Sequence, residues 1–209
     1  MPYDKFSTIT QSNIDDAHIK HKLWLANAVN GERAVFDSCS IDNVNMNGCT
    51  FSGASFRLAS IGNSCMIGAD FQNTNFEYVK FYNVAASGTS FNNCNFSYST
   101  FLSTNFADSD FKNVNFYNTD IQSVNVSYTN FQDANLIIGG YDSRGYLFYA
   151  YRRPDNGITI RAGCRTFHNL GDAYYHWNTR HRNNIVLSEE IMGNLDKIKR
   201  VARAKGWIE

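Results

Sequence analysis

Apolar residues recur at every fifth position between Phe36 and Leu136, with alanine taking the place once, at Ala86. A helix repeats its face every 3.6 residues and a strand every second residue, so neither element produces this period. A strict five-residue repeat sustained over this length predicts a solenoid in which each side of a coil is five residues long.

The same series separates into columns when it is read at intervals of twenty residues. Phenylalanine dominates two columns, which run from Phe36 to Phe116 and from Phe51 to Phe131. The other two columns, beginning at Ile41 and Met46, also contain valine, alanine and phenylalanine. This sorting is expected if four pentapeptides complete one turn of a square coil, because residues twenty apart then lie directly above one another. The segment 34–136 would contain about five such coils.

The positions around each central residue fit a narrow tube with polar corners. Two residues before it the chain carries small or short-branched side chains, as at Ala54, Thr74 and Cys94, which can point inward beside a large ring without overfilling the interior. The neighbouring positions are rich in Asn, Ser, Asp and Gly, which tolerate corner conformations and bond to nearby backbone. The sequence therefore places corners, rather than a polar active site, at these positions.

At this point the chain resembles the pentapeptide-repeat family, whose repeat is written A-[DN]-[LF]-x-x. Ala-Asp-Phe at 69–71 and Thr-Asn-Phe at 74–76 and 104–106 follow that pattern. The resemblance implies a right-handed quadrilateral β-helix. Members of the family include proteins that protect DNA gyrase by imitating DNA, so the fold by itself does not determine an activity.

A helix is predicted before the repeats. Ser12 or Asn13 can cap it, and it is expected to end at Asn30-Gly31, where Gly31 suits a left-handed closing residue. The first coil of a solenoid exposes its core and unpaired strand edges, so the helix is expected to cover that end. The segments 21–25 and 31–36 resemble the lead-in of bacterial and phage pentapeptide-repeat proteins.

Beyond Leu136 the period stops. The sequence predicts a turn-rich linker over 137–146, a strand over 147–152, a turn at 154–157, a returning antiparallel strand over 158–162 and helical spacing over 166–180. A final helix is expected to start at Ser188, with Ile191, Leu195, Ile198 and Val201 facing inward and a basic last turn that suits the helix dipole. Segments 142–146 and 162–167 resemble a small domain attached to pentapeptide repeats in phage and prophage proteins.

Together these elements predict a mainly β protein in three parts. They are an N-terminal helical cap over 1–33, the solenoid over 34–136, and a small basic α+β domain over 137–209 that also caps the far end of the solenoid. The chain has five cysteines and no CxxC pair, so neither a disulfide framework nor a zinc ribbon is expected.

Charge is unevenly distributed along a chain whose net charge is zero. Residues 34–136 hold eight acids and three bases, and residues 137–209 hold seven acids and twelve bases. Five coils at about 4.8 Å spacing span roughly 25 Å, over which duplex DNA carries about fifteen negative charges. The solenoid's net charge of −5 falls about threefold short of this, so solvated corners explain its acids better than DNA mimicry does.

Two groups of residues are candidates for binding a partner. On the solenoid, Leu58, Tyr78 and Tyr98 are spaced by twenty and share one outward corner, where they either form a binding face or stack for stability alone. Bases interleaved with aromatic residues in the C-terminal domain suit a protein interface or nucleic acid. The candidates in that domain are Arg144, Tyr149, Tyr151, Arg152, Arg153, Arg161, Arg165, Trp177 and Arg180, with Arg182 beside them.

Thiol chemistry at Cys164 is a rival interpretation. The residue could lie at a helix N-terminus, where the dipole lowers the pKa of a thiol, with His168, His176, Asp142 and Asp172 as base and orienting partners. No nucleophile motif surrounds it. Cys164, His168, His176 and His181 match no familiar zinc spacing, so we expect neither a catalytic residue nor a metal or cofactor.

The sequence therefore predicts a non-enzymatic interaction protein, associated with phage, in which a rigid solenoid and a basic, aromatic domain bind a protein partner. Nucleic acid is the second candidate partner, and a homo-oligomer or a virion component also fits. The rival functions are a DNA mimic that binds gyrase or another DNA-binding protein, and the thiol enzyme. No segment is apolar enough to span a membrane, and the expected location is the host cytoplasm or a phage particle.

Overall fold

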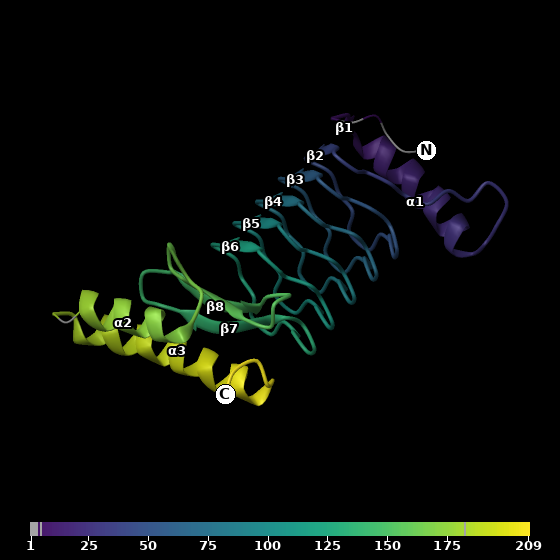
Figure 1. Cartoon of the computed structure of the whole chain (residues 1–209). Coiled ribbons are helices and arrows are strands. Elements are labelled where there is room, and N and C mark those ends of the chain that lie inside the picture. Colours follow the sequence, from purple (N-terminus) through teal and green to yellow (C-terminus); the bar gives the residue numbers. More distant parts are fainter. Residues whose placement is uncertain (1–3, 5, 182) are drawn as a thin grey trace. The chain divides into compact units, whose positions relative to one another are not determined.

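The computed structural model describes residue 4, residues 6–181 and residues 183–209 (Figure 1). The chain divides into two compact units, one ending at Ala134 and the other spanning Asn135–Glu209.

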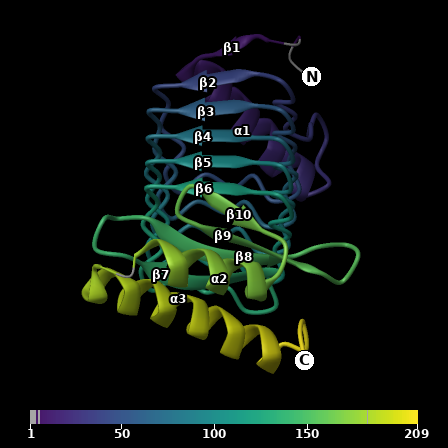
Figure 2. The ribbon, with the colours of Figure 1, turned by 60° about the vertical axis from the view of Figure 1, so that its left-hand side comes forward.

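Parallel pairing at intervals of twenty residues builds the solenoid unit. One side of the coils forms a sheet in the order β1-β2-β3-β4-β5-β6, whose rungs are visible in Figure 2. Its strands are β1 (Thr8–Ile9), β2 (Ser40–Asp42), β3 (Ser60–Gly62), β4 (Lys80–Tyr82), β5 (Thr100–Leu102) and β6 (Asp120–Gln122). Single bridges join the coils on the other three sides, for example Val35 to Ser55, Asn45 to Cys65 and Thr50 to Asp70. The predicted four-sided parallel β-solenoid is confirmed.

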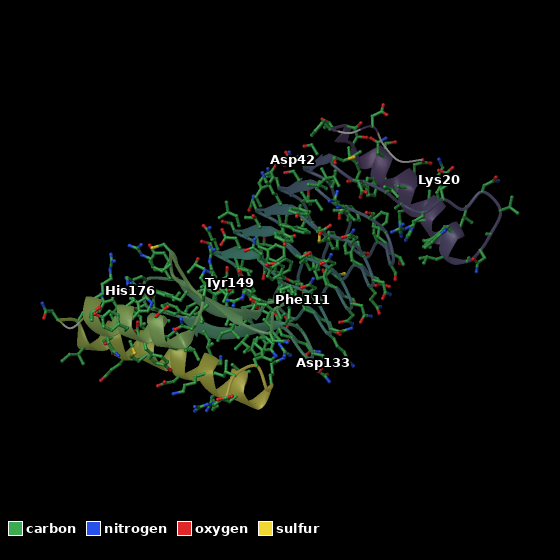
Figure 3. All side chains as sticks on the ribbon, viewed as in Figure 1. Lys20, Asp42, Phe111, Asp133, Tyr149 and His176 are labelled. Carbon is green, nitrogen blue, oxygen red and sulfur yellow. The ribbon has the colours of Figure 1, made fainter. Side chains whose placement is uncertain are left out.

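The predicted columns fill the interior. Phe56, Phe76 and Phe96 are fully buried, and their rings stack with centroids 5.2 and 4.8 Å apart. The neighbouring column meets them edge to face, as where Phe91 lies 5.4 Å from Phe96. Figure 3 labels Phe111, which is 1% exposed, and on the outside of the coils Asp42 and Asp133. Both ring arrangements are favourable for aromatic pairs, so the core is held by directional packing as well as by burial.

The corners repeat one backbone conformation. Every fifth residue from Ser38 to Asp133 has a positive φ. Asn, Gly, Ser and Asp hold most of these positions because they reach the left-handed region at low cost. This requirement explains the enrichment of short polar residues beside the core positions. The exceptions are Leu58, Tyr78, Tyr98 and Tyr128.

The predicted N-terminal helix is present, but with different ends. Helix α1 (Gln11–Leu25) is capped by Thr10, which forms a capping box with Asn13, so the prediction of Ser12 or Asn13 as the cap was wrong. Gly31 does not close the helix in the left-handed region either; it is needed for a close approach. A Cβ on Gly31 would lie 2.4 Å from the backbone nitrogen of Trp24.

Side chains on one face of α1 bond to the backbone of the first coil. Gln11 pairs with both backbone groups of Asn45, and His18 Nε2 accepts a hydrogen bond from Thr50 N–H at 3.0 Å. His21 Nδ1 accepts from Ala34 N–H at 3.1 Å, which leaves its Nε2–H to donate to the Ser52 carbonyl at 3.0 Å. These side chains take the place of a preceding coil, since one coil later the N–H groups of Cys65 and Asp70 donate the corresponding bonds to the backbone carbonyls of Val44 and Cys49. Strand β1 takes the place of a preceding coil on another side, where it pairs with β2; the sequence analysis did not predict this strand.

The C-terminal unit is an antiparallel sheet packed against two helices. The sheet order is β10-β9-β8-β7, and the core between sheet and helices includes Phe148, Ile160, Ile191 and Leu195. The elements are β7 (Leu136–Tyr141), β8 (Leu147–Arg152), β9 (Ile158–Ala162), β10 (Arg165–Phe167), α2 (Leu170–Arg180) and α3 (Ile185–Ala204). The strands predicted over 147–152 and 158–162 are confirmed.

Other predicted bounds in this unit were wrong. Half of the expected linker over 137–146 is strand β7, which carries a bulge between Ile138 and Gly140. The glycines serve packing, because a Cβ on Gly140 would lie 2.4 Å from Asn194 Oδ1 of α3. Helix α2 starts only after Asn169, and α3 starts at its cap Asn184, before Ser188.

Replacing a stacked core ring should destabilise the solenoid strongly. We expect Phe96→Ala to lower the free energy of unfolding by about 3–5 kcal/mol, because it leaves a cavity between Phe76 and Phe116. Ile67→Ala, at a side chain that is 46% exposed, is the matched control and should change it by less than about 0.5 kcal/mol. Urea unfolding followed by circular dichroism measures both; an unchanged Phe96→Ala midpoint would contradict the core assignment.

Acid should weaken the side-chain cap. Burial lowers the pKa of both His18 and His21 below the ordinary value of 6.5, and each accepts a hydrogen bond that requires a neutral ring. A base with a lowered folded pKa contributes stability that is complete above pH 6.5 and is lost as the pH falls from there towards the folded pKa. We expect a lower unfolding midpoint in urea at pH 5.5 than at pH 7.5.

A non-titrating variant isolates this effect. His18→Gln retains an acceptor but cannot be protonated. It should therefore reduce the difference between the unfolding midpoints measured at pH 5.5 and at pH 7.5. His168→Gln, at an exposed histidine of the C-terminal unit, is the control and should leave the difference as in the parent protein. Equal effects of the two variants would refute the role of His18.

Candidate interaction surface

Tyrosines form a stacked strip on one outer corner of the solenoid. Tyr78 and Tyr98, one coil apart, are each 39% exposed and stack with centroids 4.8 Å apart and planes within 9°. Tyr117 meets Tyr98 edge to face at 5.3 Å, and Leu58, 47% exposed, continues the column one coil before Tyr78. Partial burial and the adjacent Tyr117 hydroxyl raise the pKa of Tyr98.

An arginine extends this strip. The Arg57 guanidinium lies 5.6 Å from the Tyr78 ring centroid and is paired with Glu77 at 2.9 Å. The backbone N–H of Arg57 donates a hydrogen bond to the side chain of Asp37, which lies one coil earlier, and this bond holds the corner in place. We call Arg57, Leu58, Tyr78, Tyr98 and Tyr117 the tyrosine corner. Its side chains are already ordered, so a partner that binds there loses little conformational entropy in the interface.

The backbone conformation of these tyrosines is costly. A residue with a side chain in the left-handed region costs roughly 1–2 kcal/mol, whereas an aromatic pair returns about 0.5–1.5 kcal/mol. Stacking can therefore offset much of the cost at Tyr78 and Tyr98, which have φ of 58° and 61°. Tyr128 has φ 55°, is 91% exposed and contacts no aromatic ring among the described residues. Stacking therefore does not account for tyrosine at position 128, which lies in a different column of corners from Tyr78 and Tyr98.

The aromatic candidates of the C-terminal unit are not on its surface. Tyr149 is 1% exposed, Tyr151 5% and Trp177 4%, so the prediction that these rings contact a partner is corrected. Figure 3 labels Tyr149 on the sheet. Tyr146 and Tyr175, at 46% and 75%, are the exposed tyrosines near the candidate bases.

The candidate bases lie in different environments. Arg165 and Arg180 are exposed, whereas Arg152 and Arg161 are half-buried. Arg153 is held by Asp155 and by the Ile158 carbonyl. Arg182 lies outside the described residues.

Arg144 is held in the turn between β7 and β8. Asp142, 5% exposed, accepts hydrogen bonds from the backbone N–H groups of Arg144 and Tyr146 and pairs with the Arg144 guanidinium at 2.6 Å. That guanidinium also lies 5.1 Å from the Tyr146 ring centroid. Arg144 therefore stabilises the turn, and its charge is compensated locally.

The proposed thiol arrangement lacks its main requirement. Cys164 lies with Gly163 in the turn between β9 and β10, whereas the cap of α2 is Asn169, so no helix dipole acts on the thiol. Among the solenoid cysteines, burial raises the pKa of Cys39 to about 11 and also raises the pKa values of Cys49 and Cys94. These thiols are therefore protonated at neutral pH and poorly suited to nucleophilic attack.

Within the described parts of the chain, no three His, Cys, Asp or Glu side chains are placed to hold a metal ion. The helices among the same residues are too short or too polar to cross a bilayer. A hollow of about 460 Å³ beside α1 contains charges of both signs, including Lys20 paired with Asp16. That internal pairing gives the hollow no marked preference for an ion of either sign.

Sequence reasoning identified only part of the tyrosine corner. Tyr78 and Tyr98 were found through their spacing, but Arg57 was missed. Its position exactly twenty residues before Glu77 was the available signal, because that spacing places an opposite charge one coil away. Tyr128, which the sequence also places near a corner, takes a position that Gly holds at 48, 68 and 88.

Comparisons with known proteins agree with the coil geometry. The sequence model of pentapeptide repeats, which describes eight copies of the repeat, matches four overlapping ranges of the chain: residues 54–93, 74–113, 89–127 and 101–137. No curated protein matches the chain.

Solved structures of pentapeptide-repeat proteins resemble the chain at low identity. Rfr23 from the cyanobacterium Cyanothece 51142 is 14% identical, with a TM-score of 0.31, over 58% of this chain and 93% of its own. A protein of the Arabidopsis thaliana thylakoid lumen is 14% identical, with a TM-score of 0.27, over 71% of this chain and 83% of its own. QnrB1, a plasmid-mediated fluoroquinolone resistance protein, is 15% identical, with a TM-score of 0.28, over 49% of this chain and 67% of its own.

Removing the unpaired tyrosine should stabilise the protein. Because asparagine tolerates the left-handed region better, we expect Tyr128→Asn to raise the free energy of unfolding by about 0.5–1 kcal/mol. Asn73→Ser, at another corner with φ 58°, is the control and should have a smaller effect of opposite sign. Urea unfolding measures both variants, and a destabilised Tyr128→Asn would show that the ring contributes to folding.

Proposed function

Because residues 54–137 are pentapeptide repeats, we propose that this chain is a non-enzymatic interaction protein whose solenoid presents the tyrosine corner to a protein partner. The observation that carries the proposal is the presence of exposed tyrosines at corners where the backbone favours Asn or Gly. Residues in unfavourable backbone conformations concentrate at functional sites, so the use of tyrosine at these positions supports a role in binding.

The chemistry of the corner suits a protein surface. Together with tryptophan, tyrosine and arginine are the residues enriched at interface hot spots, and both combine a large apolar area with polar groups. The Arg57–Glu77 pair and the Tyr78–Tyr98 stack hold the strip in one arrangement before binding. The C-terminal bases are a second contact region in this proposal, without the buried rings of Tyr149, Tyr151 and Trp177.

The biological setting is also part of the proposal. Association with phage rests on the resemblance of segments 142–146 and 162–167 to a domain attached to pentapeptide repeats in phage and prophage proteins. Action in the host cytoplasm or in a phage particle follows from that association.

The geometry does not favour the two rival functions. Several solenoid acids serve as acceptors that hold coils together: Asp37 binds Ser55, Asp42 binds Tyr82 and Asp110 binds Asn130. This role explains their presence without DNA mimicry. The thiol enzyme would require activation that the turn position of Cys164 does not provide.

Substitutions that preserve the corner backbone test the proposal. We expect the double variant Tyr78→Asn/Tyr98→Asn to fold normally, since asparagine suits positive φ, and to lose at least tenfold in partner affinity. Affinity capture from host lysate identifies the partner, and titration calorimetry with the purified partner measures the loss. Asn73→Ser, at another corner, is the matched control and should bind like the parent protein.

The same experiment separates the rivals. Unchanged binding by the double variant, together with loss in Arg165→Gln/Arg180→Gln, would move the interface to the C-terminal unit and contradict the tyrosine corner. If the protein inhibits supercoiling by gyrase and the double variant inhibits it equally, DNA mimicry would be favoured.

A further inference from the structure

Three aromatic side chains in the C-terminal unit form a cluster that the proposed function does not use. Trp177 of α2 is almost fully buried, and His181, the C-cap of that helix, stacks on it with centroids 5.3 Å apart and planes within 12°. His176 meets the Trp177 ring edge to face at 4.9 Å. We call His176, Trp177, His181 and the adjacent Arg180 the Trp177 cluster.

Each of the three rings carries a buried nitrogen without a partner in the described chain. These atoms are His176 Nε2, Trp177 Nε1 and His181 Nε2. Buried polar groups are nearly always hydrogen-bonded, so three such nitrogens on contacting rings indicate that a bound group completes them. An indole N–H can only donate, so this group must accept hydrogen bonds.

The charges around the cluster are positive. Arg165 and Arg180 both act on His176, and Arg144 and Arg180 act on His181, where Asp142 opposes them. Burial and these arginines lower the pKa of each histidine. Among the described residues, Arg144 is paired with Asp142, whereas Arg165 and Arg180 form no salt bridge. A cation is therefore disfavoured, and an anion would be attracted.

A hollow adjoins the cluster at Arg180 and His181. It has a volume of about 340 Å³ and is lined by Thr179, Arg180, His181, Asn183 and Asn184. Asn184 caps α3, whose twenty residues begin without an acid in the first turn. The positive end of that helix dipole therefore adds to the charge of Arg180 at the hollow.

We propose that the Trp177 cluster and the adjoining hollow bind a phosphate group. Arginine, indole N–H and backbone N–H at a helix start all donate, and a tetrahedral oxyanion offers acceptors in several directions at once, whereas a carboxylate offers two oxygens. Such an anion would also favour protonated imidazoles, which then donate from Nε2. The phosphate belongs either to a small molecule or to a nucleic acid backbone, and the two sources share this chemistry.

Inorganic phosphate is the probe for the site. The indole N–H resonances of the full-length ¹⁵N-labelled protein are followed by NMR during a phosphate titration at constant ionic strength. Trp24→Phe and Trp207→Phe assign the Trp177 resonance by elimination without altering the cluster. We expect a saturable shift of the Trp177 resonance, while the Trp24 and Trp207 resonances stay in place.

A charge-matched pair of variants tests specificity. Arg180→Gln should weaken phosphate binding at least fivefold, whereas Arg200→Gln, which removes an exposed base of α3 outside the cluster, should leave it unchanged. The proposal is overturned if chloride produces the same shift, if the Trp177 resonance does not respond, or if both variants weaken binding equally.

A single-stranded oligonucleotide distinguishes the sources of the phosphate. Saturable binding of phosphate alone supports a small-molecule ligand. Oligonucleotide binding that is at least tenfold tighter and is lost in Arg180→Gln supports a nucleic acid ligand. Oligonucleotide binding that persists in Arg180→Gln, with no response to phosphate, overturns the proposed site.

Discussion

Vertical register between residues twenty apart is the constraint on which the solenoid depends. The same spacing that stacks Phe76 on Phe96 also sets the backbone bonds between coils, such as Phe76 N–H to the Asn95 carbonyl at 2.9 Å. Ring packing and hydrogen bonding therefore support a single alignment. A shift of one residue would turn the rings outward and break the backbone ladder together, so the two interactions reinforce each other.

This register fixes the conformation of the corners and, through it, the chemistry of the surface. Turning the chain every five residues requires a left-handed residue at each corner, and most corners accordingly hold Asn, Gly, Ser or Asp. Against this regular background, departures are informative. Tyr78 and Tyr98 recover part of their conformational cost by stacking, whereas Tyr128 does not. Corners that hold a residue other than Asn, Gly, Ser or Asp therefore indicate where the surface has a role beyond folding.

The repeat made the solenoid predictable, because a period of five over many coils has only one structural explanation. The ends of elements were harder to predict. Thr10, rather than Ser12 or Asn13, caps α1, and nothing local distinguishes these candidates. Gly139 and Gly140 were interpreted as a linker, yet they lie in β7 because helix α3 approaches there. That contact joins residues far apart in sequence, which no local pattern reveals.

The candidate site was predictable only in part for a similar reason. Spacing brought Tyr78 and Tyr98 together, since vertical neighbours follow directly from the repeat. In the C-terminal unit, the sequence predicted the strand over 147–152 but not its environment, and all residues from Leu147 to Tyr151 are buried. Composition identified Trp177 as an interface residue, whereas its burial, its unpartnered nitrogen and its histidine neighbours depend on tertiary packing.

The side chains that complete the first coil have a consequence for assembly. Parallel solenoids can in principle grow without limit, because each coil offers the next a template of unpaired backbone groups. Gln11, His18 and His21 occupy that template with imidazole and amide groups that cannot themselves be extended by another strand. Where these side chains cover the first coil, the N-terminal end therefore offers no backbone template for a further coil, whereas strand β1 remains an edge strand on its own side.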